Sequence, residues 1–317
     1  MEKIEFTISI VIPLFNEESN LDLLIERIQK LSLELKERQI LAEIILVDDH
    51  SSDLTPIKIE NICKQFLNVK FIRLSKNSGS HVAIIAGLSY ASGNCASFLA
   101  GDLQDPPEII IEMIEKWKEG YSVVWAVRDN IEGVSFFSSV FSKLFYRFFN
   151  ANSSVKLPPT GADFALLDKC VVESLIKSAG SNPSLGGLIA WLGFKQTQIR
   201  YIKQARVNGK SKWTLSKKIN AFIDAFVGFS YMPMRLMTYF GFLMAASGFL
   251  YSLLIIILKL TIGRQIEGWA SMMLAILIIG GVQMIMIGIL GEYLWRNLEE
   301  SRKRPLFFVD KSGGFRD

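Results

Sequence analysis

Two long segments without a charged residue set the strongest limit on how this chain folds. "LMTYFGFLMAASGFLYSLLIIIL" occupies residues 236–258, and "GWASMMLAILIIGGVQMIMIGILG" occupies residues 268–291. At about 1.5 Å per residue, either helix would cross a hydrocarbon core of about 30 Å. A pair of buried core helices is the alternative, but these segments are long and have no polar face. We therefore predict a two-helix transmembrane hairpin over residues 236–295.

Basic residues lie mostly outside the predicted hairpin. Lys217, Lys218 and Arg235 precede the first segment, and Arg296, Arg302, Lys303 and Arg304 follow the second. The connecting loop holds Lys259 and Arg264, partly offset by Glu267. Because cytoplasmic flanks of membrane helices carry the excess of Lys and Arg, both termini are expected in the cytoplasm. The N-terminus, "MEKIEFT", has no apolar signal-peptide core, so we expect the first part of the chain to stay on the cytoplasmic side. With the two predicted spans, the expected location is the plasma (inner) membrane, as a multi-pass protein.

The first 200 residues alternate short apolar runs with amphipathic segments. We predict strands at residues 8–15, 42–49, 69–75, 95–102 and 122–128, and helices at residues 21–36, 54–66, 81–91 and 107–118. Strands that are apolar almost throughout and are separated by helices are typical of a parallel sheet covered on both faces. The expected fold class is therefore α/β, with a mostly parallel sheet and helices on both faces.

Composition narrows the possible chemistry. The formal charge of +4 is small, and no basic run is interleaved with aromatics in the first half, so nucleic acid is not an expected partner. The three cysteines have no CxxC spacing, which argues against a zinc ribbon and a disulfide framework. Two histidines are too few for a multi-histidine metal site and disfavour a Ser-His-Asp hydrolase. A metal here would be a hard cation bound by oxygen atoms.

Polar residues gather where the predicted strands end. In chain order the five ends supply Pro13, Phe15, Asn16 and Glu17; Asp48 and Asp49; Ser75, Asn77 and Gly79; Asp102 and Gln104; and Arg128. An aspartate after a strand is commonly a helix cap, and for Asp48 or Asp53 taken alone we prefer that interpretation. Four strand ends with carboxylates or amides are harder to explain by capping. Ligands of parallel sheets bind at this edge.

The first of these turns, "PLFNEESN", contains no glycine. A nicotinamide or flavin enzyme needs GxGxxG there, because its backbone must approach a pyrophosphate closely. Such an enzyme is therefore disfavoured. With acids at the edge instead, a bound diphosphate would need a divalent cation between itself and the protein. Asp102, in "AGDLQDPPE", is placed to supply a carboxylate for that cation.

Five motifs follow one another over about residues 8–215: "VIPLFNEESNL", "EIILVDDHSSD", "LSKNSGSHVAIIAGLSYASG", "AGDLQDPPE" and "RVNGKSKWT". Together with the two predicted spans, they resemble the polyisoprenyl-phosphate glycosyltransferases of glycosyltransferase family 2. That group includes dolichyl-phosphate mannose synthases and bactoprenol glucosyltransferases. The resemblance implies a GT-A (Rossmann-like) fold, a nucleotide-sugar donor, a polyprenyl-phosphate acceptor and inversion at the anomeric carbon. Association into a homo-oligomer is left open.

The resemblance also implies roles for individual residues. The nucleotide-sugar pocket would comprise Pro13, Phe15, Asn16, Glu17, Asp48, Asp49, Ser75, Asn77 and Gly79. Asp49 would accept a hydrogen bond from the base, and Asp48 would support its turn. Asp102 and Gln104 would hold Mg²⁺ or Mn²⁺ and the diphosphate. The acceptor phosphate would be bound by Arg206, Ser211 and Lys212, and Arg128 is a candidate to share that task. Asp163, in "TGADFALL", is a candidate for contacting the sugar or the acceptor, with turn capping equally favoured.

One position departs from the family pattern. The family often has Asp-x-Asp, and Ala100 stands where the first acid would be, so we expect weaker metal retention rather than loss of activity. For the same reason, a non-enzymatic membrane scaffold that retains the fold remains an alternative. A processive polysaccharide synthase is disfavoured, because the chain has neither further spans nor a QxxRW motif. The whole-chain layout favours UDP-glucose as donor, with GDP-mannose as the alternative.

Two aromatic segments are predicted to lie on membrane lipids. "VSFFSSVFSKLFYRFFN" (134–150) places aromatic residues along one helical stripe with Lys143 and Arg147 elsewhere, which suits an interfacial helix; a core helix is the alternative. Residues 212–235 form a second such segment. The expected organisation is a cytoplasmic catalytic domain (1–210), interfacial amphipathic helices (211–235), two transmembrane helices (236–295) and a cytoplasmic tail (296–317).

Overall fold

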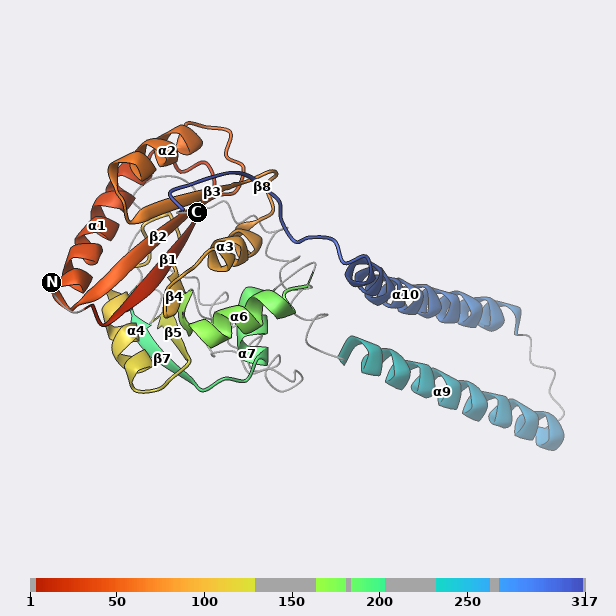
Figure 1. The fold of residues 1–317 in the computed structure, drawn as a ribbon. Coiled ribbons are helices and arrows are strands. Elements are labelled where there is room, and N and C mark those ends of the chain that lie inside the picture. The colour runs from red at the N-terminus through yellow and green to blue at the C-terminus, as the bar shows by residue number, and fades with distance from the viewer. Residues whose placement is uncertain (1–3, 129–163, 181–183, 203–231, 263–267, 316–317) are drawn as a thin grey trace. The chain divides into compact units, whose positions relative to one another are not determined.

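The computed structural model describes residues 4–128, 164–180, 184–202, 232–262 and 268–315 (Figure 1). The chain divides into two units. The first comprises Met1–Ala225 together with Pro305–Asp317, and the second comprises Phe226–Arg304. The first unit contains the sheet with its helices, and the second contains two long helices.

In the described part of the first unit, eight strands form one sheet in the order β7-β5-β6-β4-β1-β2-β3-β8. They are β1 (Phe6–Leu14), β2 (Ile40–Asp48), β3 (Val69–Leu74), β4 (Cys95–Phe98), β5 (Val123–Arg128), β6 (Phe164–Asp168), β7 (Gln196–Tyr201) and β8 (Val309–Gly313). β6 runs antiparallel to β4 and β5, and β8 runs antiparallel to β3. The other neighbouring pairs are parallel. The α/β class with a mostly parallel sheet is confirmed.

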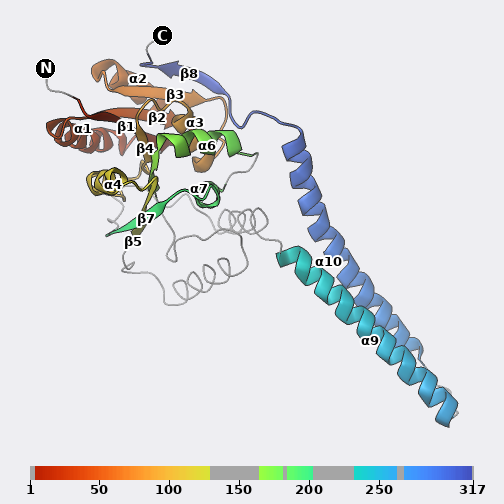
Figure 2. The same cartoon turned by 60° about the horizontal axis from the view of Figure 1, so that its bottom comes forward.

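Six helices accompany this sheet in the described residues: α1 (Leu21–Glu37), α2 (Thr55–Gln65), α3 (Ser80–Ser89), α4 (Ile109–Lys118), α6 (Lys169–Ser178) and α7 (Leu185–Trp191). α1 is amphipathic and buries its apolar stripe, whereas α3 is apolar nearly all round and is buried from Val82 to Leu88. A Cβ on Gly87 would lie 2.3 Å from Val11 Cγ1, so α3 rests directly on β1. α1 and α2 lie on one face of the sheet, and α3 and α6 lie on the other (Figures 1 and 2).

The strand order reverses between β1 and β4. The chain passes from β1 to β2 to β3 in one direction and then returns to place β4 on the other side of β1. Because parallel crossovers are right-handed, this reversal moves the connecting helix to the opposite face. In sheets of this kind, ligands bind in the crevice at the carboxyl ends of the strands on either side of such a reversal, which here are β1 and β4.

All nine strands and helices predicted from the sequence are present, within a few residues of the predicted bounds. The predicted fourth strand is shorter than expected, because β4 ends at Phe98 and the chain turns away after one more ladder bond, from Leu99 N to Val11 O at 3.0 Å. β6, β7 and β8 were not predicted. Residues 296–317, predicted only as a tail, contain the end of α10, up to Ser301, and the strand β8.

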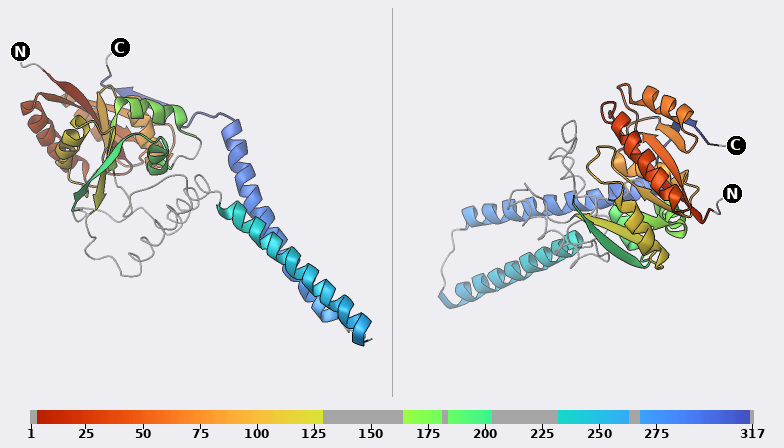
Figure 3. Two further views of the ribbon diagram at one scale, coloured as in Figure 1. Left: turned by 90° about the horizontal axis from the view of Figure 1, so that it is seen from below. Right: turned by 90° about the vertical axis from the view of Figure 1, so that its left-hand side faces the viewer.

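In the described residues, the second unit contains α9 (Met232–Ile262) and α10 (Trp269–Ser301) (Figure 3). Each contains a stretch of 24 residues that is long and apolar enough to cross a membrane, Arg235–Leu258 and Ile278–Ser301. Large apolar side chains on both helices are exposed, among them Phe242, Phe249 and Met284. Such surfaces suit lipid as the surrounding solvent.

Candidate active site

The loops after β1 and β2 are joined by hydrogen bonds between side chains and backbone. Asn16 N donates to Ser51 Oγ at 2.9 Å, and Ser52 N donates to Asn16 Oδ1 at the same distance. Glu17 N donates to Thr55 Oγ1, also at 2.9 Å. These bonds satisfy backbone groups that no longer have partners in the sheet, because both loops lie beyond the ends of their strands. The two loops consequently form one connected edge.

Asp48, the last residue of β2, is buried, with 1% of its surface exposed. Its Oδ1 accepts from Ser51 N at 3.0 Å, and its Oδ2 lies 3.4 Å from Arg73 Nε on β3. A buried carboxylate requires such compensation, because its transfer out of water is otherwise very unfavourable. Asp48 thus holds the turn that carries Asp49 and Ser51.

Asp49 joins the end of β2 to the start of α3. Its Oδ1 accepts from Ser78 N at 2.7 Å, and its Oδ2 accepts from Gly79 N at 2.9 Å. Burial raises the pKa of this carboxyl, the two backbone donors lower it, the charge of Asp48 raises it and His50 lowers it, which leaves the pKa above its ordinary value. Stability from such a group is present at low pH and is lost as pH rises through the folded pKa. An ionised Asp49 therefore opposes folding, as carboxylates at functional sites often do.

Asp102 lies just beyond β4, beside the end of β1. A Cβ on Gly101 would lie 2.5 Å from Leu14 Cδ2 and 3.3 Å from Pro13 O, so only glycine allows this close approach. Asp102 is half-buried, and its Oδ1 accepts from Gln104 N at 3.3 Å. Because β1 and β4 flank the reversal in strand order, Asp102 stands at the position where a ligand of this sheet is expected.

Three residues other than glycine have a positive φ at this edge. They are Asn16 after β1 (51°), His50 after β2 (60°) and Leu103 after β4 (62°). Asn and His adopt this region more readily than most residues, but Leu rarely does. Strained residues of this kind cluster at ligand-binding sites, where the surrounding structure holds them in place. The sequence carries no signal for the conformations of His50 and Leu103.

A buried pair connects the "AGDLQDPPE" turn to β7. The Tyr201 hydroxyl donates to Asp105 Oδ1 at 2.6 Å, and the Tyr201 ring packs edge-on against Phe164 at 5.5 Å. Tyr201 is also in register with Arg128 at the end of β5. Asp105 thus bonds to a residue 96 positions away, a contact that sequence reasoning missed.

The predicted donor-site residues that the structure describes all lie at the carboxyl edge. Asn77 Nδ2 donates to Asp49 O at 3.3 Å, and Ser75 N donates to Phe308 O at 2.9 Å, in the segment before β8. The other predicted residues fall outside the described ranges: Asp163, Arg206, Ser211 and Lys212, with the segments 134–150 and 212–231.

A divalent cation fits the chemistry of the residues around Asp102. Mg²⁺ and Mn²⁺ take oxygen ligands and commonly use one or two protein groups together with phosphate oxygens. Asp102 and Gln104 offer a carboxylate and an amide oxygen on one turn. Within the described residues, no group of three or more His, Cys, Asp and Glu side chains could hold a metal by itself. Ala100 is exposed, so the missing first acid would have pointed to solvent or to a ligand.

Comparison with known protein families shows which family this chain belongs to. Residues 9–175 match Glycosyl transferase family 2, which covers β1 through most of α6. The chain belongs to glycosyltransferase family 2. Residues 232–296 of this family member match the GtrB C-terminal hairpin, which covers α9 and most of α10. The resemblance stated from the five motifs and the GT-A fold expected from it are thereby confirmed.

The similarity to individual relatives extends over nearly the whole of this chain. An uncharacterized glycosyltransferase of Bacillus subtilis is 38% identical over 96% of this chain and 94% of its own length. The bactoprenol glucosyl transferase of Shigella phage SfII is 33% identical over 96% of this chain and 98% of its own length. Among solved structures, a Pyrobaculum calidifontis mannosyltransferase in complex with GDP-Man and Mn²⁺ aligns at 15% identity and a TM-score of 0.47, over 65% of this chain and 58% of that one.

Proposed function

We propose that this glycosyltransferase moves glucose from UDP-glucose onto an undecaprenyl-type polyprenyl phosphate, with inversion, at the cytoplasmic face of the membrane. The observation that carries the proposal is the similarity to a bactoprenol glucosyl transferase over 96% of the chain, because it spans both the sheet and the hairpin. GDP-mannose, the other donor considered, is not favoured by these relatives.

The donor would bind across the crevice between β1 and β4. The connected loops after β1 and β2, with Asn16, Asp48 and Asp49, would face the nucleotide, and Asp102 with Gln104 would hold Mg²⁺ or Mn²⁺ beside the diphosphate. The cation would neutralise charge that develops on the nucleoside diphosphate as it leaves. This assignment is supported by the hydrogen bonds that join these loops and by the close approach at Gly101.

The acceptor explains why the site needs no strong base. A phosphate monoester oxygen is already ionised at neutral pH, so the protein has chiefly to position it against the sugar and stabilise charge. We assign acceptor-phosphate binding to Arg206, Ser211 and Lys212, with Arg128 at the end of β5 as a further donor. Arginine can bind phosphate through two parallel hydrogen bonds, whereas lysine acts as a point charge. Asp163 is proposed to contact the sugar or the acceptor.

The orientation of the hairpin follows from where its two ends lead. The chain before α9 forms the sheet, and the chain after α10 returns to the same sheet as β8. If both helices cross the membrane, the N-terminal end of α9 and the C-terminal end of α10 lie on the same side of it. The distribution of Lys and Arg agrees with this arrangement. We therefore propose a cytoplasmic sheet domain and two cytoplasmic termini.

The test uses the purified full-length chain with UDP-glucose and undecaprenyl phosphate, and it measures UDP release and lipid-linked glucose. We expect transfer to require the lipid phosphate, to stop in chelator and to return with Mg²⁺ or Mn²⁺. Asp102→Ala should abolish transfer, whereas Glu108→Ala, an exposed acid on the same turn, should not. Full activity in chelator would exclude the metal role. Release of UDP without lipid phosphate would argue against the acceptor.

A second arm separates the acceptor site from the donor site. Arg206→Ala should strongly weaken use of the lipid phosphate and leave UDP-glucose binding nearly unchanged, and Arg206→Lys should restore transfer only in part. Lys210→Ala, in the same "RVNGKSKWT" motif, is the matched control and should behave as the wild type. If Arg206→Ala lowered UDP-glucose affinity as much as acceptor use, Arg206 would belong to the donor site.

A further inference from the structure

The strand that follows the second membrane helix lies beside the turn after β2. β8 pairs with β3, and their register shifts between Arg73, which faces Lys311, and Leu74, which faces Val309. Asp310 is the additional residue at this irregularity. Because bulges change the direction in which a side chain points, the irregularity allows Asp310 to approach β3 sideways.

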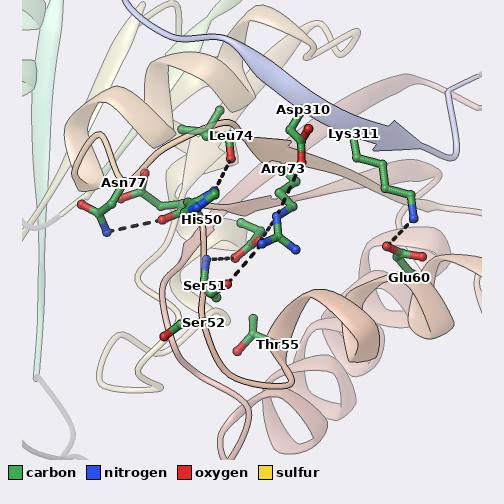
Figure 4. A network of polar contacts seen from close by, with 12 residues as sticks. His50, Ser51, Ser52, Thr55, Glu60, Arg73, Leu74, Asn77, Asp310 and Lys311 are labelled. Carbon is green, nitrogen blue, oxygen red and sulfur yellow. Dashed lines mark hydrogen bonds and ion pairs between the residues drawn. The ribbon is translucent and has the colours of Figure 1, made fainter.

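Arg73 lies between Asp310 and the turn after β2. Its Nε is 3.9 Å from Asp310 Oδ2 and 3.4 Å from Asp48 Oδ2, and its terminal nitrogen donates to Ser51 O at 3.3 Å. Figure 4 shows the Arg73 side chain directed between Asp310 and Ser51. One guanidinium thus contacts a carboxylate on the C-terminal strand and two groups of the turn.

The contacts continue to the loop after β1. Ser51 N donates to Asp48 Oδ1, and Ser51 Oγ accepts from Asn16 N. A continuous path of ion pairs and hydrogen bonds therefore runs from Asp310 through Arg73 and Ser51 to Asn16, one of the residues assigned to the nucleotide-sugar pocket.

The ion pair between Arg73 and Asp48 is not fixed by a hydrogen bond of its own. Neither Arg73 Nε nor Asp48 Oδ2 has a hydrogen-bond partner among the described residues, although both atoms are buried. The position of the guanidinium then depends on its other contacts, Ser51 O and Asp310. A long, flexible side chain held at several points loses the freedom to leave a buried carboxylate.

We infer that Arg73 is a positioning residue for the nucleotide-sugar pocket and that β8, through Asp310, holds Arg73 in place. This inference rests on the proposed function, since it assigns the turn after β2 to the donor site. It gives the C-terminal strand a role in donor binding that neither the motifs nor the family matches assign to it. Asp310 acts through Arg73 and touches neither donor nor acceptor.

The same strand offers a matched control. Lys311, next to Asp310, forms an ion pair with Glu60 on α2 at 2.6 Å. Figure 4 shows Lys311 directed toward Glu60, away from Arg73 and Ser51. The Lys311–Glu60 pair is shorter than the Arg73–Asp310 pair and is hydrogen-bonded, so a loss of β8 docking alone would affect Lys311→Gln at least as strongly as Asp310→Asn. Only Asp310 is connected to the donor turn.

The experiment compares Asp310→Asn with Lys311→Gln in the full-length protein by two measurements. The first is hydrogen–deuterium exchange at the Ser51 amide, which reports the turn without any ligand. For Asp310→Asn we expect exchange about two- to fivefold faster, the range for an exposed ion pair, and for Lys311→Gln no change. The second is UDP affinity with transfer kinetics. Asp310→Asn should weaken UDP binding and raise the KM for UDP-glucose by a similar factor, with kcat unchanged.

Two variants of Arg73 complete the test. Arg73→Gln leaves Asp48 buried without its cation, so we expect an effect above about tenfold on both measurements or loss of folding. Arg73→Lys keeps the charge without the planar fork and should restore UDP affinity in part. Equal effects of Asp310→Asn and Lys311→Gln would overturn the inference, as would an unchanged Ser51 exchange rate in Asp310→Asn. If the wild type binds no UDP, the proposed function fails, while the exchange measurement still decides whether β8 positions the turn.

Discussion

Tyr201→Phe would remove a single oxygen atom from the buried pair that links the "AGDLQDPPE" turn to β7. The Tyr201 hydroxyl donates to Asp105 Oδ1 at 2.6 Å, and the two residues are only 3% and 5% exposed. The phenylalanine ring would keep the edge-on contact with Phe164. The substitution therefore isolates one hydrogen bond and leaves the apolar packing intact.

The expected loss of stability follows from the burial of both partners. Loss of its donor by a buried acceptor costs about 1–3 kcal/mol. For domains of 150–250 residues, 1 kcal/mol changes the Tm by about 2–4 °C. We expect the Tm of the sheet domain to fall by about 2–12 °C in Tyr201→Phe. Asp105→Asn retains an acceptor and should lose less.

The assay is thermal unfolding of the purified protein at constant detergent and lipid, together with transfer kinetics well below the Tm. Asp105 lies on the same turn as Asp102, but its described bond points to β7 rather than to the crevice. Tyr201→Phe should therefore lower stability and leave the KM for UDP-glucose unchanged. Tyr121→Phe is the matched control, since the Tyr121 ring lies under Lys195 Nζ at 4.4 Å and its hydroxyl is not part of that contact.

A double-mutant cycle checks that the two residues act as a pair. The combined Tyr201→Phe and Asp105→Asn variant should lose clearly less stability than the sum of the single losses, because either change alone already breaks the bond. A wild-type Tm in Tyr201→Phe would refute the reasoning. Loss of transfer with an unchanged Tm would show instead that Asp105 takes part in the chemistry.

Three further outcomes are expected elsewhere in the chain. Burial raises the pKa of Glu43, but hydrogen bonds from Lys70, Ser9 and Ser92 outweigh it and hold the pKa below its ordinary value of 4.5. Its stabilising contribution is therefore present above pH 4.5 and is lost as pH falls through the folded pKa. Glu43→Gln should lower stability at neutral pH by about 3 kcal/mol and should make stability depend less on pH below pH 4.5. An unchanged pH dependence in this acid range would contradict the prediction. Gly101→Ala should lower stability by about 1–3 kcal/mol and also raise the KM for UDP-glucose, because its Cβ would meet Leu14; wild-type kinetics would show that the close approach is not needed. Tags at the N-terminus and after Phe315 should both be protected in sealed right-side-out cells, while a tag near Gly263 should be accessible. An accessible C-terminus would mean that one of the two apolar segments does not span the membrane.

The local elements and the membrane hairpin were determined by the sequence itself. Burial is indicated by the spacing of apolar residues in runs such as "EIILVDD" and in the stripe of α1 from Leu21 to Leu35. This spacing is visible within a few positions of the chain. The length and apolar composition of the two charge-free segments likewise predict helices that lie in lipid. The motifs also located Asp49, which directly follows β2, and Asp102, which lies four residues beyond the end of β4.

Strand pairing was decided only by the tertiary structure. β8, "VDKSG", is short, polar and mostly exposed, so no apolar pattern marks it as a strand. It becomes one because β3 presents an unpaired edge next to it. β6 has an apolar pattern, but nothing local shows that it runs antiparallel between β4 and β5.

The contacts that arrange the candidate site belong to the same class. Asp105 bonds to Tyr201 across 96 positions, and Arg73 meets Asp310 from the far end of the chain. His50 and Leu103 have a positive φ that no local pattern in the sequence indicates. Residue types and spacing indicate which groups carry chemistry, since those are local properties of the chain. Which of them meet depends on the balance of burial and pairing over the whole sheet, and that balance exists only in the folded molecule.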